Sequence, residues 1–278
     1  EMVTNPEVLK RARPSESLLK AVLRTKHLMN QDVLAVARSL IRDVVEQLTR
    51  ALLQEAQAPF FGSKDKRKRS YTRMSKNLDA RATIQKNLRH YDAASKRLYI
   101  ETPIFNSRLR RNSERWNIYI LLDQSGSMVE NVIHSSIVAS IFFAVPALKT
   151  RLIAFDTNII DLSDSVGDPV ETLMRVQLGG GTDIGMAVEY AANLIETPQK
   201  SIVVLISDFY EGAPPQLLIS GVKAMAESGV KLLGLAALDR NAAPVYDRHI
   251  AEQLAAVGMQ VAAMTPAELA VWVAEKVK

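Results

Sequence analysis

Apolar residues spaced three and four apart predict two helices within residues 15–57. One such stripe runs from Leu18 to Leu23, and a longer one runs from Val33 to Leu52. This spacing places apolar side chains on one face of a helix. Asn30 is expected to cap the second helix, because its side chain accepts a bond from an unpaired backbone N–H. Each stripe is expected to pack either against the chain's own core or against a partner helix.

The pattern changes at Trp116, where short apolar runs begin to alternate with amphipathic segments. The runs predict buried strands at 117–122, 151–155, 159–162, 201–206, 230–236 and 259–263. The remaining segments predict helices at 127–147, 169–175, 184–195, 215–228, 246–257 and 266–277. This alternation indicates βαβ units with right-handed crossovers. The expected fold is α/β, a doubly wound, mostly parallel Rossmann-like sheet preceded by a smaller helical region.

Charge divides the chain at the same place. Residues 1–114 hold 24 Lys and Arg against 12 Asp and Glu, a net charge of +12, whereas residues 115–278 hold 11 against 18, a net charge of −7. The difference predicts two units, a basic, mainly helical region at 1–114 and an α/β domain at 115–278. The run 64–73 holds six basic residues and one acid, which predicts a solvated loop. Short extended pieces are expected around 98–100 and 104–105.

Composition excludes several kinds of chemistry. The chain has no cysteine, which rules out disulfides, thiolate metal sites and cysteine nucleophiles. Its apolar runs all break before the roughly 20 residues that a membrane span needs, so no span is expected. The first residues show no signal-peptide pattern. Together these features predict a cytoplasmic protein.

Oxygen-bearing side chains follow two of the expected strands and precede one of the expected helices. Asp123, Ser125 and Ser127 come directly after the first strand of the sheet. Asp208 comes after the strand that is most apolar, and Thr182 follows three glycines. In a doubly wound fold, ligands bind at the carboxyl ends of the strands, where the strand order reverses. We therefore expect these five side chains to converge.

Two carboxylates and three hydroxyls are hard oxygen ligands, and the segments that carry them contain no histidine. Such a set suits Mg²⁺, with Mn²⁺ or Ca²⁺ as alternatives, and does not suit Zn²⁺ or Cu²⁺. If the hydroxyls bind directly and the carboxylates act through water, the ion stays electron-poor and keeps an open position. A Glu or Asp of a partner protein would then complete the shell, and the metal would bridge two proteins.

This set of five residues resembles the metal-ion-dependent adhesion site of von Willebrand factor A (VWA) domains. The match to the Asp-x-Ser-Gly-Ser-Met form is complete through Met128, and the resemblance covers about residues 115–278. It implies a VWA fold in which the five side chains form a metal site. Many adhesion sites have glycine after the last aspartate, whereas this chain has Phe209. That departure bears on partner access and not on the ligand atoms.

The segment 78–88, Leu-Asp-Ala-Arg-Ala-Thr-Ile-Gln-Lys-Asn-Leu, resembles the bacterial CoxE-like group of VWA proteins. Members of that group typically work with MoxR-type AAA+ ATPases, as adaptors in metal insertion or complex assembly. The resemblance implies a bacterial adaptor that docks such an ATPase onto a client. It implies no catalysis by the chain itself.

Other interpretations of the same residues stay open at this point. Asp123, Ser125 and Ser127 could serve only as caps of the following helix. Gly179–Gly181 could cradle a phosphate, but neither a P-loop nor a Gly-x-Gly-x-x-Gly spacing is present. A metal-dependent phosphohydrolase is a further alternative, although the three segments hold no Lys or Arg to stabilise a phosphoryl group. Asp183 is expected to begin a helix and not to bind metal.

The basic region supports a different alternative, RNA binding. Phosphates could be contacted by the run 64–73 and by Arg108, Arg110, Arg111 and Arg115. Tyr71 and Tyr91 could stack on bases. An acidic protein partner would satisfy the same positive charges, so both kinds of partner are candidates for this region.

Overall fold

The structure is a computed structural model, and it describes residues 15–57, 64–69, 75, 78–93, 95–108, 115–237 and 245–277. The chain divides into two compact units. The sheet unit comprises residues 1–59 and 114–278, and the basic unit comprises residues 60–113.

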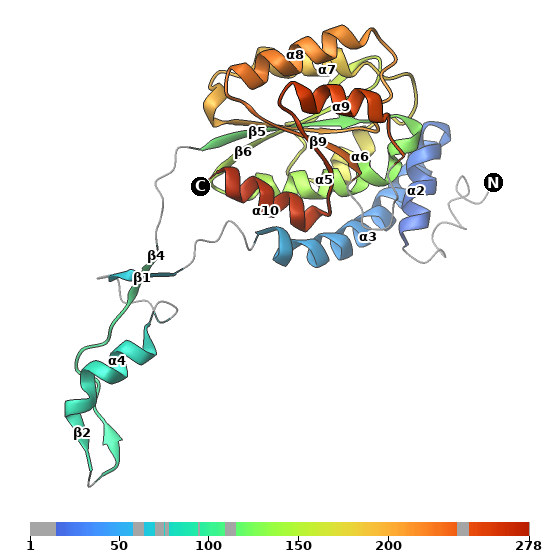
Figure 1. Ribbon diagram of the computed structural model, residues 1–278. Coiled ribbons are helices and arrows are strands. Elements are labelled where there is room, and N and C mark those ends of the chain that lie inside the picture. Colours follow the sequence, from blue (N-terminus) through green and yellow to red (C-terminus); the bar gives the residue numbers. More distant parts are fainter. Residues whose placement is uncertain are drawn as a thin grey trace. The chain divides into compact units, whose positions relative to one another are not determined.

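Six strands form one sheet in the order β10-β9-β8-β5-β6-β7 (Figure 1). Their bounds are β5 Trp116–Asp123, β6 Leu148–Phe155, β7 Ile159–Asp161, β8 Ser201–Ile206, β9 Lys231–Ala237 and β10 Gln260–Ala263. Neighbouring strands are parallel, except that β7 runs antiparallel to β6. The central strand β8 is buried along its whole length, which is why it forms an unbroken apolar run in the sequence. The predicted doubly wound, mostly parallel α/β fold is confirmed.

Helices cover both faces of this sheet (Figure 1). One face carries α7 Ile184–Leu194, α8 Pro215–Glu227 and α9 Arg248–Ala256, and the other carries α5 Val129–Phe143, α6 Pro169–Arg175 and α10 Pro266–Lys276. Proline occupies the start of α6, α8 and α10, where its missing N–H leaves no bond unmade. The helix predicted at 127–147 ends earlier, at Phe143, and the strand predicted at 151–155 begins earlier, at Leu148.

The two N-terminal helices, α2 Glu16–Thr25 and α3 Gln31–Gln57, belong to the sheet unit. The apolar stripe of α3, which includes Val33, Ala37 and Ile41, is buried because α3 packs on α5, α6 and α10. Asn30 caps α3 as predicted, with its Oδ1 accepting the Val33 N–H at 2.9 Å. The sequence-based division at residue 114 grouped these helices with the basic region, because charge does not show which surface covers an apolar stripe.

Two lysines fasten the N-terminal helices to the rest of the sheet unit. Lys20 of α2 forms an ion pair with Glu130 of α5. Lys26, in the short 3₁₀ helix η1 Lys26–Leu28, donates to the carbonyls of Leu173 at 2.9 Å and Met174 at 2.8 Å, and also to that of Val176. A cation at the end of α6 satisfies carbonyls that the helix leaves unpaired. Burial lowers the pKa of Lys26 to about 8.

Among the residues that the structure describes, one helical segment is long and apolar enough to cross a membrane. This segment is Gly126–Phe143, and 61% of it is buried inside the chain. It contains α5, which packs against the sheet and against α3. Its apolarity therefore matches its place in the core of the sheet unit.

The basic unit combines short strands with one helix. Strand β1 Lys64–Arg69 pairs antiparallel with β4 Asn106–Arg108. The helix α4 Ala80–Asn87 leads through the 3₁₀ helix η4 Leu88–His90 into a hairpin formed by β2 Tyr91–Asp92 and β3 Arg97–Leu98. The predicted loop at 64–73 is wrong for residues 64–69, because pairing with β4 makes them a strand. Residues 70–73 lie outside the described residues.

The extended pieces predicted in this unit take part in pairing. Leu98 pairs with Tyr91 in the hairpin, and Phe105 forms an isolated antiparallel bridge with Leu78. Neighbouring Ile104 is the one buried large hydrophobic residue among the described residues of 78–105. The prediction of extended backbone at both places is confirmed.

Candidate metal site

The candidate site lies where the strand order of the sheet reverses. From β5 the chain builds outward through β6 and β7, and it then returns to β8 on the other side of β5. Asp123 is the last residue of β5, and Asp208 lies two residues beyond the end of β8. Because β5 and β8 are parallel neighbours, both carboxylates stand at the same edge of the sheet. This is the location that the sequence predicted.

The two serines of the motif connect this edge to Asp208. The Ser127 hydroxyl donates to Asp208 Oδ2 at 2.8 Å, and the hydroxyls of Ser125 and Ser127 lie 3.2 Å apart. Ser127 is exposed, whereas Ser125 and Asp208 are half-buried. Neither η5 Gly126–Met128 nor α5 has a side-chain hydrogen bond at its cap. The interpretation of these serines as helix caps is therefore wrong, because their hydroxyls bond to Asp208 and to each other.

Asp123 is fully buried beneath the serines. Its Oδ1 accepts the Ser125 N–H at 2.8 Å, and its Oδ2 accepts the Ser207 hydroxyl at 2.7 Å. Burial raises the pKa of Asp123, and the negative charge of Asp208 raises it further, while the bonds from Ser125 and Ser207 lower it. A buried carboxylate that is held in place by hydrogen bonds is suited to support ligands from behind rather than to meet a partner.

Backbone hydrogen bonds fix the position of the loop that carries Thr182. Its carbonyl accepts the Gly212 N–H at 2.9 Å, which joins its loop to the segment after β8. The same loop is tied to the first strand, because the Gly179 N–H donates to the Gln124 carbonyl at 3.2 Å. Gly179 and Gly180 have φ of 133° and 92°, a backbone conformation that favours glycine. The loop thus needs its glycines to place the half-buried Thr182.

Several residues that shape the site were not identified from the sequence. The buried Gln124 side chain accepts the Gln177 N–H at 3.1 Å through Oε1 and so holds the start of the glycine loop. Glu211 accepts the Ile184 N–H and the Ala213 N–H, each at 3.0 Å, which ties the start of α7 to the segment after β8. No sequence motif indicates these roles, because each depends on which backbone N–H groups lie near the side chain in the folded chain.

The role of Asp183 follows the prediction. Its side chain accepts the Met186 N–H at 2.8 Å and caps α7. An aspartate bound in this way stabilises the first turn of a helix. Asp183 is therefore a helix cap next to Thr182 and not a member of the ligand set.

Phe209 stands where many adhesion sites have glycine, and its backbone conformation is one that favours glycine. Its backbone has φ of +61°, in the left-handed region that non-glycine residues seldom adopt. The side chain is fully buried and packs edge-on against Tyr246 with ring centroids 6.3 Å apart. A Cβ on Gly234 would come within 3.0 Å of the Phe209 ring, so that glycine makes room for it. Phe209 points into the core and does not obstruct the site.

The donor set fits a hard divalent cation. Asp123, Ser125, Ser127 and Asp208 are joined by direct hydrogen bonds, and the Thr182 carbonyl is bonded to Gly212, which follows Asp208 in the chain. Within the described ranges, no group of three or more His, Cys, Asp or Glu side chains is placed to hold a metal. Two carboxylates with neutral hydroxyls suit Mg²⁺, which keeps part of its shell for water or an added ligand.

Comparison with known proteins places the chain in a family. The family described as "VWA domain containing CoxE-like protein" matches residues 48–273. A relative from Escherichia coli (strain K12), described as "Uncharacterized protein YehP", is 52% identical over 278 residues, which are all of this chain and 74% of that protein.

Two solved structures align with parts of the chain. The von Willebrand factor type A structure from Catenulispora acidiphila is 17% identical, with a TM-score of 0.45, over 63% of this chain and 43% of that one. An aerotolerance-related membrane protein from Bacteroides fragilis is 14% identical, with a TM-score of 0.44, over 58% of this chain and 98% of that one. The sequence matches carry the assignment. The chain belongs to the family of CoxE-like proteins that contain a VWA domain.

Proposed function

We propose that the chain is a metal-dependent protein-binding adaptor. The observation that carries the proposal is the exposed Ser127 hydroxyl, which is bonded to Asp208 and lies next to Ser125 above the buried Asp123. This arrangement offers oxygen ligands on the outside and a fixed negative charge underneath. A VWA domain in a CoxE-like protein is consistent with a role in protein interaction.

Each residue has a distinct part in this proposal. Ser125, Ser127 and Thr182 would hold a Mg²⁺-type ion through their hydroxyls, with Mn²⁺ or Ca²⁺ as alternatives. Asp123 and Asp208 would balance the charge of the ion, and their hydrogen bonds hold the Ser125 backbone and the Ser127 hydroxyl in place. The bound ion would supply a positive position that attracts a Glu or Asp carboxylate from a partner.

The partner that we propose is a MoxR-type AAA+ ATPase, and the role is complex assembly or metal insertion in the bacterial cytoplasm. Membership in the CoxE-like family supports this partner. We propose no catalysis, because the segments 123–128, 177–183 and 207–211 carry no Lys or Arg that would stabilise a transferring phosphoryl group.

The test is binding of the full chain to a purified MoxR-type ATPase from the same genome, with Mg²⁺ or with EDTA. We expect EDTA, Asp208→Asn and Thr182→Ala each to weaken binding at least tenfold. Asp164→Asn is the matched control, because Asp164 is an exposed carboxylate of the sheet unit outside the site. Binding that is indifferent to EDTA and to both variants would refute the proposal. Hydrolysis of a phosphoester at a rate that depends on Asp208 would favour the phosphohydrolase.

A further inference from the structure

The segment 78–105 of the basic unit is held together by a polar centre. Its buried residues, among those described, are Thr83, Asn87 and Ile104. Two of these three are polar, and they lie four residues apart on one face of α4. Because Ile104 is the one buried large hydrophobic residue among the described residues of this segment, apolar burial contributes little there, and directional bonds define its shape.

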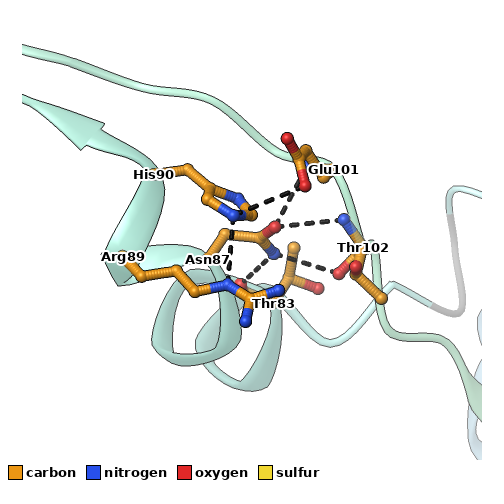
Figure 2. A network of polar contacts seen from close by, with 6 residues as sticks. All are labelled: Thr83, Asn87, Arg89, His90, Glu101 and Thr102. Atoms are coloured by element: carbon orange, nitrogen blue, oxygen red, sulfur yellow. Dashed lines mark hydrogen bonds and ion pairs between the residues drawn. The ribbon is translucent and has the colours of Figure 1, made fainter.

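The side chains of α4 bind the chain that returns from the hairpin (Figure 2). Asn87 Oδ1 accepts the N–H groups of Glu101 and Thr102, each at 3.0 Å, and Asn87 Nδ2 donates to the Thr102 carbonyl at 3.0 Å. Thr83 Oγ1 accepts the Ile104 N–H at 2.9 Å. Two side chains of the helix, Thr83 and Asn87, therefore hold the backbone of residues 101–104 in place. This gives a structural role to the segment 78–88 that resembles the CoxE-like group.

Several large apolar side chains of the same segment are exposed. Five of them are more than 45% exposed, and we name these five the apolar set: Ile84 is 47% exposed, Leu88 59%, Tyr91 52%, Tyr99 55% and Ile100 54%. Ile84 and Leu88 are four residues apart and so share one side of the helix. Exposed large hydrophobic residues that are neighbours on one surface, as Ile84 and Leu88 are on this helix, mark interaction sites. Because the polar centre defines the shape of this segment, the apolar set remains available to a partner.

The charge around the apolar set indicates what kind of partner fits. The basic unit holds 15 Lys and Arg against 4 Asp and Glu, a net charge of +11. Arg81 and Arg89 are exposed on α4 and η4, the elements that carry Ile84 and Leu88. A partner surface must therefore be acidic to complement this one. The aliphatic Ile84, Leu88 and Ile100 favour a protein over a nucleic acid, because aliphatic side chains do not stack on bases.

We propose that the apolar set, with the cations around it, docks an acidic partner protein independently of the metal site. Apolar contacts would supply the centre of this interface, and the arginines and lysines would form its charged rim. The chain would then have two separate binding surfaces, one in each unit. An adaptor needs two such surfaces if it joins one protein to another.

The first step of the test is photo-cross-linking of the full chain in its native host. A benzophenone amino acid replaces Leu88 in one version and Lys86 in the other, which stands about 200° further round the helix than Ile84. We expect a protein adduct at position 88 and none at position 86, with an acidic cross-linked segment. A nuclease-sensitive adduct, an adduct between two copies of the chain, or equal labelling at both positions would each overturn the proposal.

The second step measures binding of the identified protein, purified, to the full chain. We expect the double variant Ile84→Ser and Leu88→Ser to weaken binding at least tenfold, and rising salt to weaken it as well. Gln85→Ser is the matched control, since Gln85 is exposed on the same helix and is not apolar. Circular dichroism of each variant confirms that the chain is folded.

EDTA separates this proposal from the function proposed for the metal site. Binding through the apolar set should be unchanged by EDTA and by Asp208→Asn. Binding that EDTA abolishes would assign the partner to the metal site and overturn the inference. Failure of the metal site to bind Mg²⁺ would leave docking through the apolar set intact, so the two proposals fail separately.

Discussion

The two units of this chain are stabilised in different ways. The sheet unit buries whole strands, such as β8, between two layers of helices. The described helix and hairpin of the basic unit instead close around the hydrogen bonds of Thr83 and Asn87, and the five side chains of the apolar set stay exposed. The sheet unit holds 20 basic against 26 acidic residues, whereas the basic unit holds 15 against 4. Burial gives a rigid frame for the candidate metal site, and directional bonds leave the apolar set exposed for the docking that we propose.

Removing a core side chain of the sheet unit should produce the largest loss of stability, and the loss should be confined to that unit. Leu121→Ala empties space in β5, where the side chain is fully buried, and should lower the free energy of unfolding by about 3 kcal/mol. Both tryptophans, Trp116 and Trp272, lie in the sheet unit, so urea unfolding followed by their fluorescence reports on that unit. Val271→Ala, at an exposed apolar position of α10, should cost less than 1 kcal/mol. Equal costs for both changes would contradict a buried core at β5.

Breaking the polar centre should open the basic unit and leave the sheet unit intact. Asn87→Ala removes the amide that bonds to Glu101 and Thr102, with an expected local cost of about 2 kcal/mol. Hydrogen exchange of those two backbone amides should accelerate about thirtyfold, while the tryptophan-detected transition stays in place. Gln85→Ala should change neither measurement. Unchanged exchange in Asn87→Ala would show that the apolar residues define this unit after all.

The sequence predicted the sheet unit well because its strands are unbroken apolar runs between clear helix signals. The strand 201–206 and the helix 169–175 were predicted to the residue. The convergence of Asp123, Ser125, Ser127 and Asp208 was predicted because motif spacing and the reversal of strand order point to the same edge, and their role as metal ligands stays a prediction. The strand at 64–69 was missed, because a run of like charges hides the backbone pairing with β4.

Roles that depend on backbone geometry were beyond sequence reasoning. Ser207 holds Asp123 from a position with no motif of its own. Phe209 adopts a backbone conformation usual for glycine, and the space left by Gly234 accommodates its ring. The placement of α2 and α3 on the sheet unit follows from the surface that buries them, and no local pattern encodes it.

A pair of glycine substitutions tests how closely the metal site depends on the rigid frame. A Cβ at Gly212 would stand 2.6 Å from the Thr182 carbonyl oxygen, whereas a Cβ at Gly126 would meet nothing within 4 Å. Gly212→Ala should therefore move Thr182 and weaken Mg²⁺ binding about tenfold, or about 1.4 kcal/mol. Gly126→Ala should leave the affinity within about twofold. Equal losses in calorimetry would show that the placement of Thr182 by Gly212 is unimportant.

The smallest expected effect concerns the attachment of the N-terminal helices. The pKa of Lys26 is about 8 in the folded chain and 10.5 as its ordinary value, so between these pH values the unfolded chain binds more protons. The free energy of unfolding should therefore rise as pH increases from 8 to 10, by about 1 kcal/mol after allowance for solvent screening. Tryptophan-detected unfolding of wild type and Lys26→Met should show this difference in slope. Parallel pH profiles would contradict the burial of the Lys26 ammonium.

The central proposal is that five oxygen-bearing side chains, four at or just beyond the ends of β5 and β8 and Thr182 in the loop before α7, hold one divalent cation. Calorimetric titration of Mg²⁺ into the full chain and into Asp208→Asn tests it most directly. The account predicts about one ion per chain in the wild type and a large loss of affinity in the variant, because Asp208 balances the charge and orients Ser127. Equal affinity in both proteins would place the ion elsewhere and contradict the account.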